Sequence, residues 1–291
     1  MTRIIRSLTQ QEQLNFLLTN RIPRRLVTKM MGRYSNIENR LLTRLSLMVW
    51  KLFADDLDLT ESKTRKFKSL GECFTRELKE GARTIDQREN IITSPCDAIV
   101  GACGRIKDTK VYQAKGFPYE LGDLIPDPEL QQKYRNGMFV TLRLKSSMYH
   151  RFHAPVKCSI RNIMYISGDT WNVNPVALKR VENLYCKNER AIVELINEDI
   201  EGSITLVPVA AILVASIKFN CLEETLSLKY KGPNSLFCSA TYEKGDEMGY
   251  FQHGSTIILF ATENFDLLEH IHPGVRVNMG EALLTNETID S

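Results

Sequence analysis

The hydrophobic pattern divides the chain into a helical beginning and a strand-rich remainder. Pro23 and Gly32 punctuate the first part and predict short helices there. One strong amphipathic helix is predicted over residues 36–53, and another helical patch is expected over 69–79 after a charged linker. The apolar residues of the stronger helix recur at helical spacing; they are Leu41, Leu45, Met48, Val49, Leu52 and Phe53.

From Ile91 onward the residue pattern changes to short runs rich in Val, Ile, Thr and Tyr, separated by Gly, Pro and Asn. Such spacing favours a mostly antiparallel β sandwich or barrel-like core. The fold class is therefore predicted as α+β, with a helical segment over 1–60 and a β-rich domain over 61–291. The expected strands are 98–104, 138–144, 160–166, 191–195, 204–209, 212–219, 226–230 and 257–261.

The distribution of charge suggests a function for the helical segment. Residues 1–52 hold ten Lys/Arg against two Glu, a net +8, whereas the whole chain of 291 residues carries only +3. Arg40, Arg44 and Lys51 follow one edge of the amphipathic helix, and Trp50 lies toward the other. Two interpretations stay open: the helix lies on an anionic lipid surface, or it packs on the main domain with a solvated basic edge.

Composition restricts the class of protein. Hydrophobic residues make up 43% and charged residues 25% of the chain, which is typical of a globular protein. The longest uncharged apolar stretch, 204–217, is too short to span a bilayer. The chain begins without the apolar stretch of a signal peptide, and its seven cysteines form no C-x-x-C pair. We therefore expect a cytoplasmic chain with reduced thiols.

Tyr149-His150-Arg151-Phe152-His153-Ala154-Pro155 places two of the five histidines three residues apart. Three interpretations compete: a metal site, acid–base chemistry, or a histidine that is simply hydrogen-bonded in the core. The metal interpretation has little support, because the pair supplies two ligands and no partner cluster has recognisable spacing.

Two further segments carry candidate chemistry. Asp97 follows a proline-led turn before an apolar strand, so it is either a turn-capping residue or the orienting acid of an Asp–His–Ser arrangement. Gly254-Ser255-Thr256 lies between a glycine-containing approach and the apolar run 257–260. A serine hydroxyl is a weak nucleophile and would need an adjacent base.

Taken together, these motifs resemble the phosphatidylserine decarboxylase proenzyme family. The resemblance covers roughly residues 20–285, and the motifs occur in family order. The matching stretches are Phe74-Thr75-Arg76-Glu77-Leu78-Lys79, Gly81-Ala82-Arg83, Ser94-Pro95-Cys96-Asp97, Lys115-Gly116, the His150/His153 segment, Val173-Asn174-Pro175, Asn188-Glu189-Arg190, Val207-Pro208-Val209-Ala210-Ala211 and Gly249-Tyr250-Phe251 through Gly254-Ser255-Thr256.

The resemblance implies roles for individual residues. Asp97, His153 and Ser255 correspond to the self-processing triad, and His150 to the histidine that assists decarboxylation. Cleavage between Gly254 and Ser255 would leave chains of 254 and 37 residues and convert Ser255 into a pyruvoyl group. That covalent group is the implied cofactor and acts as the electron sink of a carboxy-lyase, with neither pyridoxal phosphate nor metal.

The implied reaction converts phosphatidylserine to phosphatidylethanolamine in phospholipid biosynthesis. A lipid substrate gives Arg40, Arg44 and Lys51 a role in binding an anionic membrane. The expected partners are thus phosphatidylserine, the membrane surface and the second self-processed chain of a heterodimer, with homo-oligomerisation left open and no nucleic acid. The expected location is peripheral, on the cytoplasmic face of a membrane.

Some positions depart from the family pattern, and Ala210 and Ala215 replace glycines. An added methyl near a tight cleavage loop could slow maturation or narrow the pocket. Three alternatives stay open: a pyruvoyl decarboxylase of a soluble amino acid, a non-cleaving lipid-binding or carrier-like module, and, ranked last, a nucleic-acid binder. The β region lacks the aromatic and basic pattern of an RNA-binding sheet.

Overall fold

The structure is a computed structural model that describes Phe16 and residues 22–54, 56–114, 117–213, 216–252 and 255–286, without the side chains of Phe53 and Ala114. It is a mixed helix and sheet fold whose strand pairs are antiparallel, so the coarse α+β prediction is confirmed. Within these residues no helix is both long and apolar enough to cross a bilayer.

The predicted amphipathic helix is confirmed as α4 (Arg40–Phe53), preceded by α3 (Arg24–Ser35). Asn39 fixes its start, because the Asn39 side chain accepts hydrogen bonds from the N–H groups of Leu41 and Leu42 at 3.0 Å each. The short helices later in the chain are α6 (Leu121–Leu124), α7 (Pro128–Lys133), α8 (Pro175–Leu178) and α9 (Leu184–Lys187).

The helix predicted over 69–79 is wrong beyond its first turn. The observed helix α5 spans only Leu70–Phe74. After it, the backbone pairs with an earlier segment: the N–H of Lys63 donates to the Glu77 carbonyl, and the N–H of Lys79 donates to the Glu61 carbonyl, both at 2.9 Å. These long-range hydrogen bonds replace the helical ones that local propensity would favour.

The strands of the described residues form four antiparallel sheets. The largest has the order β12-β7-β8-β9-β14-β5-β2-β16, and the others have the orders β11-β10-β13-β6, β1-β17-β15 and β3-β4. The strand bounds are β1 Ile91–Thr93, β2 Ala98–Arg105, β3 Lys110–Ala114, β4 Phe117–Glu120, β5 Met138–Leu144, β6 Arg151–His153, β7 Cys158–Ile166, β8 Arg190–Leu195, β9 Ile204–Val209, β10 Ser216–Phe219, β11 Leu226–Ser227, β12 Ser235–Tyr242, β13 Glu247–Phe251, β14 Ser255–Ala261, β15 Phe265–Leu267, β16 Arg276–Val277 and β17 Ala282–Asn286.

The eight-stranded sheet separates two hydrophobic clusters. Along β14, Ile257 and Leu259 enter one cluster, whereas Ile258 and Phe260 enter the other. All seven residues of β14 are buried, which explains its continuous apolar run. Since β12 and β16 lie at opposite edges, the described strands of this sheet do not close into a barrel. The sandwich or barrel-like description therefore stays a prediction.

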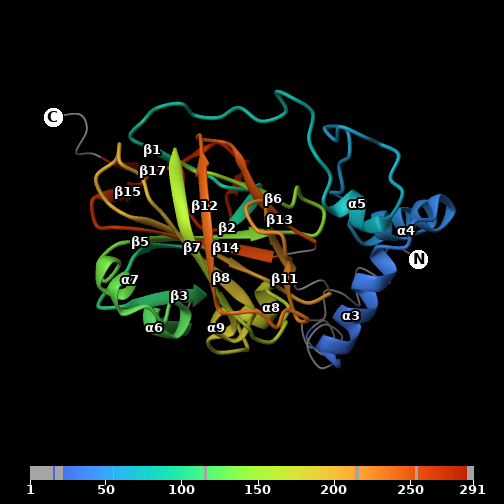
Figure 1. The fold of residues 1–291 in the computed structure, drawn as a ribbon, viewed down its shortest axis with the longest axis horizontal. Coiled ribbons are helices and arrows are strands. Elements are labelled where there is room, and N and C mark those ends of the chain that lie inside the picture. Colours follow the sequence, from blue (N-terminus) through green and yellow to red (C-terminus); the bar gives the residue numbers. More distant parts are fainter. Residues whose placement is uncertain are drawn as a thin grey trace.

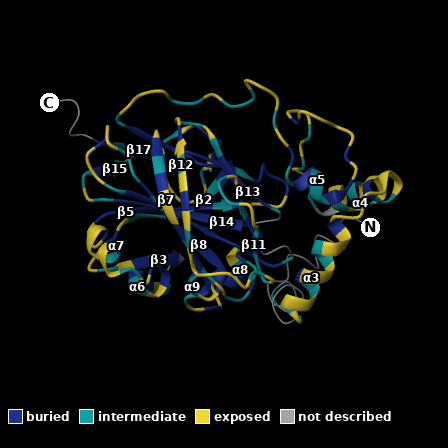
Figure 2. Cartoon of the chain, viewed as in Figure 1, coloured by how far each residue is buried: buried dark blue, intermediate teal, exposed yellow. Residues whose placement is uncertain are grey.

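The helices α3, α4 and α5 lie together at one end of the molecule, beside the sheets (Figure 1). Much of α3 and α4 is exposed, in contrast to the buried central strands (Figure 2). The apolar stripe of α4 is itself exposed: Leu41 by 68%, Met48 by 56% and Leu52 by 55%. Another side of the helix packs on the protein, where the Trp50 ring lies 4.2 Å from that of Phe74 and Thr43 is buried, so both interpretations of the helix stay predictions. The side chain of Phe53, the last predicted member of the stripe, lies outside the described residues.

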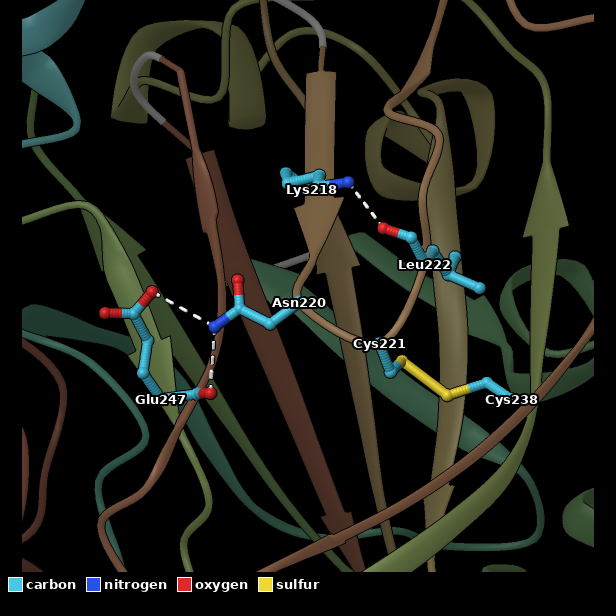
Figure 3. Close-up of a disulfide and its surroundings, with 6 residues drawn as sticks. All are labelled: Lys218, Asn220, Cys221, Leu222, Cys238 and Glu247. Carbon is cyan, nitrogen blue, oxygen red and sulfur yellow. Dashed lines mark hydrogen bonds between the residues drawn. A yellow bond between two sulfur atoms is a disulfide. The ribbon is translucent and has the colours of Figure 1, made fainter.

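A disulfide joins Cys221, which follows β10, to Cys238 on β12 (Figure 3). The expectation of reduced thiols is therefore wrong for this pair. The odd cysteine count and irregular spacing carry no pairing information, because the contact arises only when distant strands meet. The free thiols in the described part of the chain are Cys73, Cys96, Cys103, Cys158 and Cys186.

Candidate functional site

Ser255 opens strand β14 at the middle of the eight-stranded sheet. It lies opposite Leu144 of β5, and its side chain is fully buried. Its hydroxyl has no hydrogen-bond partner among the described residues, a property shared by the buried hydroxyls of Tyr119, Thr141, Thr170 and Thr256. Ser255 differs from these four by its position, because it is the first residue of β14 and directly follows Gly254 in the sequence. His253 and Gly254, which precede Ser255, lie outside the described residues.

The imidazole of His150 also lacks hydrogen-bond partners of normal geometry among the described residues. It is fully buried, and neither ring nitrogen makes a hydrogen bond of normal geometry, although the Met148 carbonyl lies close enough to favour the protonated form. Burial, reinforced by the positive charge of Arg76, lowers the pKa of His150 to about 3. The imidazole is therefore neutral at pH 7.

An aromatic contact series connects His150 to helix α4. The Phe74 ring meets His150 edge-on at 6.0 Å between centroids, and the Trp50 ring lies 4.2 Å from that of Phe74. Trp50 belongs to the exposed amphipathic helix and Phe74 to the short helix α5. The surface of α4 is thus separated from a buried, neutral histidine by one aromatic side chain.

His153 is held on strand β6 by contacts at both ring nitrogens. Nδ1 lies 2.8 Å from the carbonyl oxygen of Gly245, and Nε2 lies 3.0 Å from the Tyr149 hydroxyl. A carbonyl can only accept, so Nδ1 carries the proton and Nε2 accepts from the hydroxyl. Burial lowers the pKa of His153, which keeps this neutral tautomer. With both nitrogens occupied, the metal interpretation of the histidine pair gains no support.

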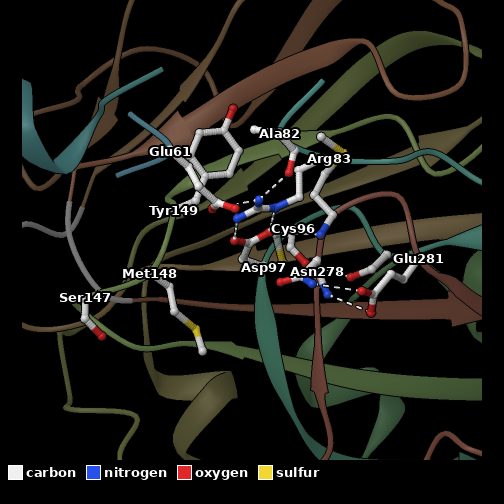
Figure 4. Close-up of polar contacts among 12 residues, drawn as sticks. Glu61, Ala82, Arg83, Cys96, Asp97, Ser147, Met148, Tyr149, Asn278 and Glu281 are labelled. Carbon is white, nitrogen blue, oxygen red and sulfur yellow. Dashed lines mark hydrogen bonds and ion pairs between the residues drawn. The ribbon is translucent and has the colours of Figure 1, made fainter. Parts of the chain in front are cut away.

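Asp97 is buried but binds an arginine (Figure 4). Arg83 donates from Nε to Oδ1 at 2.9 Å and from Nη2 to Oδ2 at 2.5 Å, and the N–H of Met279 donates to Oδ1 at 2.9 Å. Arg83 also meets the partly exposed Glu61 at 2.9 Å. The paired carboxylate raises the pKa of Arg83 further above its usual range.

Asp97 lies close enough to His150 and His153 for its charge to act on the pKa of each, but the predicted triad is not assembled. Among the described residues, no hydrogen bond joins Asp97 to His153 or His153 to Ser255. The Gly245 carbonyl occupies the place at His153 Nδ1 that the triad prediction gives to Asp97. The triad assignment therefore stays a prediction.

Three residues near the site were not assigned a role from sequence, although all lie in the family-like motifs. Arg76, Arg83 and Tyr149 line a cavity of about 330 Å³ together with Asp97. Arg76 is 5% exposed and donates to the carbonyls of Cys73 and Ser147, while its Nε has no partner. The presence of Arg76, Arg83 and Tyr149 in family-like motifs was the only indication in the sequence that they have a role. The contacts of each side chain become visible only in the fold.

Of the two alanines that replace family glycines, only Ala210 lies within the described residues. Ala210 is buried, and its N–H donates to the Glu189 carbonyl at 2.8 Å while its own carbonyl accepts from Asn188 at 2.9 Å. The backbone of Ala210 is thus hydrogen-bonded on both sides, and an effect of its methyl group on maturation stays a prediction. Ala215 lies outside the described residues.

Comparisons with known proteins point to one family. A family model described as phosphatidylserine decarboxylase matches residues 70–285. The phosphatidylserine decarboxylase proenzyme of Acinetobacter baylyi is 34% identical over 268 residues, covering 90% of this chain and 92% of the relative. The proenzymes of Shewanella putrefaciens and Vibrio parahaemolyticus are 31% and 33% identical, covering 93% and 89% of this chain and 97% and 94% of theirs.

Proposed function

The chain belongs to the phosphatidylserine decarboxylase family, and on that premise we propose that it acts through a pyruvoyl group made by its own cleavage between Gly254 and Ser255. It is a carboxy-lyase that converts phosphatidylserine to phosphatidylethanolamine in phospholipid biosynthesis. The observation that carries the cleavage proposal is the position of Ser255, whose buried hydroxyl has no partner among the described residues and which opens β14 directly after Gly254 in the sequence.

Self-processing would begin with the Ser255 oxygen attacking the Gly254 carbonyl carbon. The backbone nitrogen leaves that carbon and an ester forms; removal of the Ser255 α-proton then expels the Gly254 carboxylate and leaves dehydroalanine. Addition of water and loss of ammonia give the pyruvoyl group. The result is a heterodimer of 1–254 and 255–291 chains.

His153 is suited to serve as the base in this sequence. Its Nε2 is unprotonated, because Nδ1–H donates to Gly245 and burial lowers the pKa of the ring. Tyr149 now donates to Nε2, so the hydroxyl of Ser255 must replace that of Tyr149 during processing. Asp97 would stabilise the imidazolium that forms, as in other triads.

Decarboxylation requires a place for the electrons left behind by CO2, and a pyruvoyl group at residue 255 supplies that electron sink. We propose that His150 positions substrate there and moves a proton through its ring N–H. Its neutral state and the lack of a hydrogen bond of normal geometry at either ring nitrogen, among the described residues, support this role. Burial first, and then the positive charge of Arg76, lower the pKa of the ring and keep it neutral.

Access to a lipid substrate would come through the helical segment. We propose that residues 1–60 associate peripherally with the cytoplasmic face of a membrane and that 61–291 form the catalytic domain. The exposed apolar stripe of α4 and the cations Arg40, Arg44 and Lys51 support this proposal, because they match an interfacial helix on an anionic surface. Trp50 and Phe74 would then connect the membrane-facing helix to His150.

The decisive variant is Ser255→Ala. It removes the hydroxyl that starts cleavage and should give one uncleaved 291-residue chain without decarboxylase activity. Cleavage of this variant at the same bond would show that Ser255 is not the nucleophile.

A further inference from the structure

A cavity of about 400 Å³ lies between helix α4 and the segment 59–67. We propose that this basic cavity binds the phosphodiester headgroup of an anionic phospholipid, as a site separate from the buried Ser255 and His150. The inference rests on the proposed membrane function but goes further, because it assigns one discrete lipid site and two residues, Arg65 and Lys66, that lie outside the predicted membrane-binding set.

The charge of the basic cavity is one-sided. No Asp or Glu lines the cavity. Its five charged lining residues are all cations: Arg40, Arg44, Lys51, Arg65 and Lys66. Within the residues that the structure describes, none of these five side chains forms an ion pair or a hydrogen bond. The charge of Arg65 reaches Asp58 and helps to lower its pKa, but no ion pair joins the two.

Other exposed cations of this chain do find carboxylates. Lys63 pairs with Glu77 at 2.6 Å and Lys133 with Glu194 at 2.5 Å, and Lys145 pairs with Asp56. Five unpaired cations around one cavity repel one another, and a bound anion would relieve that repulsion. Charge complementarity therefore selects an anionic occupant.

The cavity wall favours a lipid over a soluble anion. Leu47, Met48, Leu59 and Phe67 form its apolar part. Met48 is 56% exposed and also belongs to the apolar stripe that runs along α4 between Leu41 and Leu52. A phosphodiester could thus meet the cations while its acyl chains continue along the stripe, where they would remove apolar surface from water. A free phosphate would use only the cations.

The two sides of the cavity are tied together by the fold. The Thr43 hydroxyl of α4 donates to the Lys68 carbonyl at 3.1 Å, and Phe67 is buried against the protein. The spacing between the α4 cations and Arg65 and Lys66 is therefore set before a lipid arrives, which lowers the ordering cost of binding.

The test uses uncleaved Ser255→Ala protein and dihexanoyl phosphatidylglycerol below its critical micelle concentration, followed by isothermal titration calorimetry. Phosphatidylglycerol has no amine and cannot enter the decarboxylation reaction. We expect saturable binding at one site, weakened about tenfold or more in R65E/K66E. The matched control K107E/K110E makes the same charge change at exposed residues of the β2–β3 turn and should bind as the parent does.

Two other ligands identify the source of the binding energy. Glycerophosphoglycerol carries the same phosphodiester without acyl chains, and dihexanoyl phosphatidylcholine carries the chains without net charge; both should bind about tenfold more weakly than phosphatidylglycerol. Equal binding of glycerophosphoglycerol would overturn the lipid assignment in favour of a site for a soluble phosphate ester. Equal binding of phosphatidylcholine, or unchanged phosphatidylglycerol binding in R65E/K66E, would overturn the basic cavity as an anion site.

Failure of the inference can be told apart from failure of the proposed membrane function. Sedimentation with vesicles of phosphatidylcholine and phosphatidylglycerol tests the latter. If the parent chain binds vesicles but R65E/K66E retains full affinity for the short-chain lipid, only the discrete site is wrong. If the parent chain does not bind vesicles, the membrane proposal itself is wrong. Both variant residues are exposed, and thermal unfolding of each variant confirms that the fold is kept.

Discussion

Arg83 binds both carboxylate oxygens of Asp97, at 2.9 Å from Nε to Oδ1 and 2.5 Å from Nη2 to Oδ2. This pairing holds the carboxylate of Asp97, which is 2% exposed, beside the loop that leads to His153. Asp97 therefore binds Arg83 and not the imidazole of His153. If Asp97 acts in the proposed triad, it must approach His153 during processing.

The first prediction concerns Asp97→Asn. The Oδ1 of asparagine can still accept from Arg83 Nε and from the Met279 N–H, but its Nδ2 cannot accept from Nη2, so thermal unfolding must show that the variant keeps its fold. Without the negative charge, the imidazolium of His153 loses its stabilising partner, and self-cleavage should slow by about 100-fold or more. The measurement is the appearance of the 37-residue chain with time. Glu61→Gln, which removes only the exposed partner of Arg83, is the control and should cleave normally.

A variant Asp97→Asn that cleaves at the parent rate would leave Asp97 with a purely structural role. In that case the Gly245 carbonyl would be sufficient to orient His153.

The second prediction separates the two histidines. His153→Ala removes the base proposed for processing and should leave an uncleaved chain. His150→Ala should still cleave, but its product should turn over phosphatidylserine at least about 100-fold more slowly. Electrophoresis scores cleavage, and release of CO2 scores turnover. Two mature but inactive variants would show that this division of roles is mistaken.

The third prediction tests the membrane surface of α4. Reversing Arg40, Arg44 and Lys51 to Glu should weaken binding to anionic vesicles by about 100-fold, since each basic residue near such a surface contributes about 1 kcal/mol. Added salt should weaken binding of the parent chain in the same way. The control reverses Lys107, Lys110 and Arg161, which are exposed elsewhere. Equal loss in both variants would attribute the effect to net charge alone.

The fourth prediction concerns Glu189, which is 1% exposed. Burial raises the pKa of Glu189 from 4.5 to about 7, opposed by the Tyr165 hydroxyl, which donates to Oε1 at 2.6 Å. Because the folded state holds this proton more tightly than the unfolded state, the stabilisation is present below pH 4.5 and is lost as the pH rises to about 7.

Glu189→Gln should remove that dependence. Between pH 5 and pH 8, the parent chain should lose about 2 to 3 kcal/mol of unfolding free energy that the Gln variant retains. Urea unfolding at the two pH values measures the difference, with both chains carrying Ser255→Ala so that each unfolds as a single polypeptide. Parallel pH dependence in both chains would contradict a raised pKa at Glu189.

The predictions made from sequence succeeded where a local pattern decides the structure. Strand β5 matches its predicted bounds of 138–144, and α4 differs from prediction only at its start, where Asn39 caps the helix. The predictions failed where a contact with a distant segment determines the structure. Residues 75–79 pair with 61–63 and do not continue the helix, and Cys221 forms a disulfide with Cys238. The candidate residues were found through family-like motifs, but the Arg83–Asp97 pair and the Tyr149–His153 contact depend on tertiary structure that no local pattern encodes.

The central claim is that this chain makes its own cofactor at Ser255, and an intact mass spectrum of the purified protein tests it most directly. The account predicts two chains of 254 and 37 residues, with the smaller one beginning in a pyruvoyl group and therefore lacking a free amino terminus. A single 291-residue mass from catalytically active protein would contradict it.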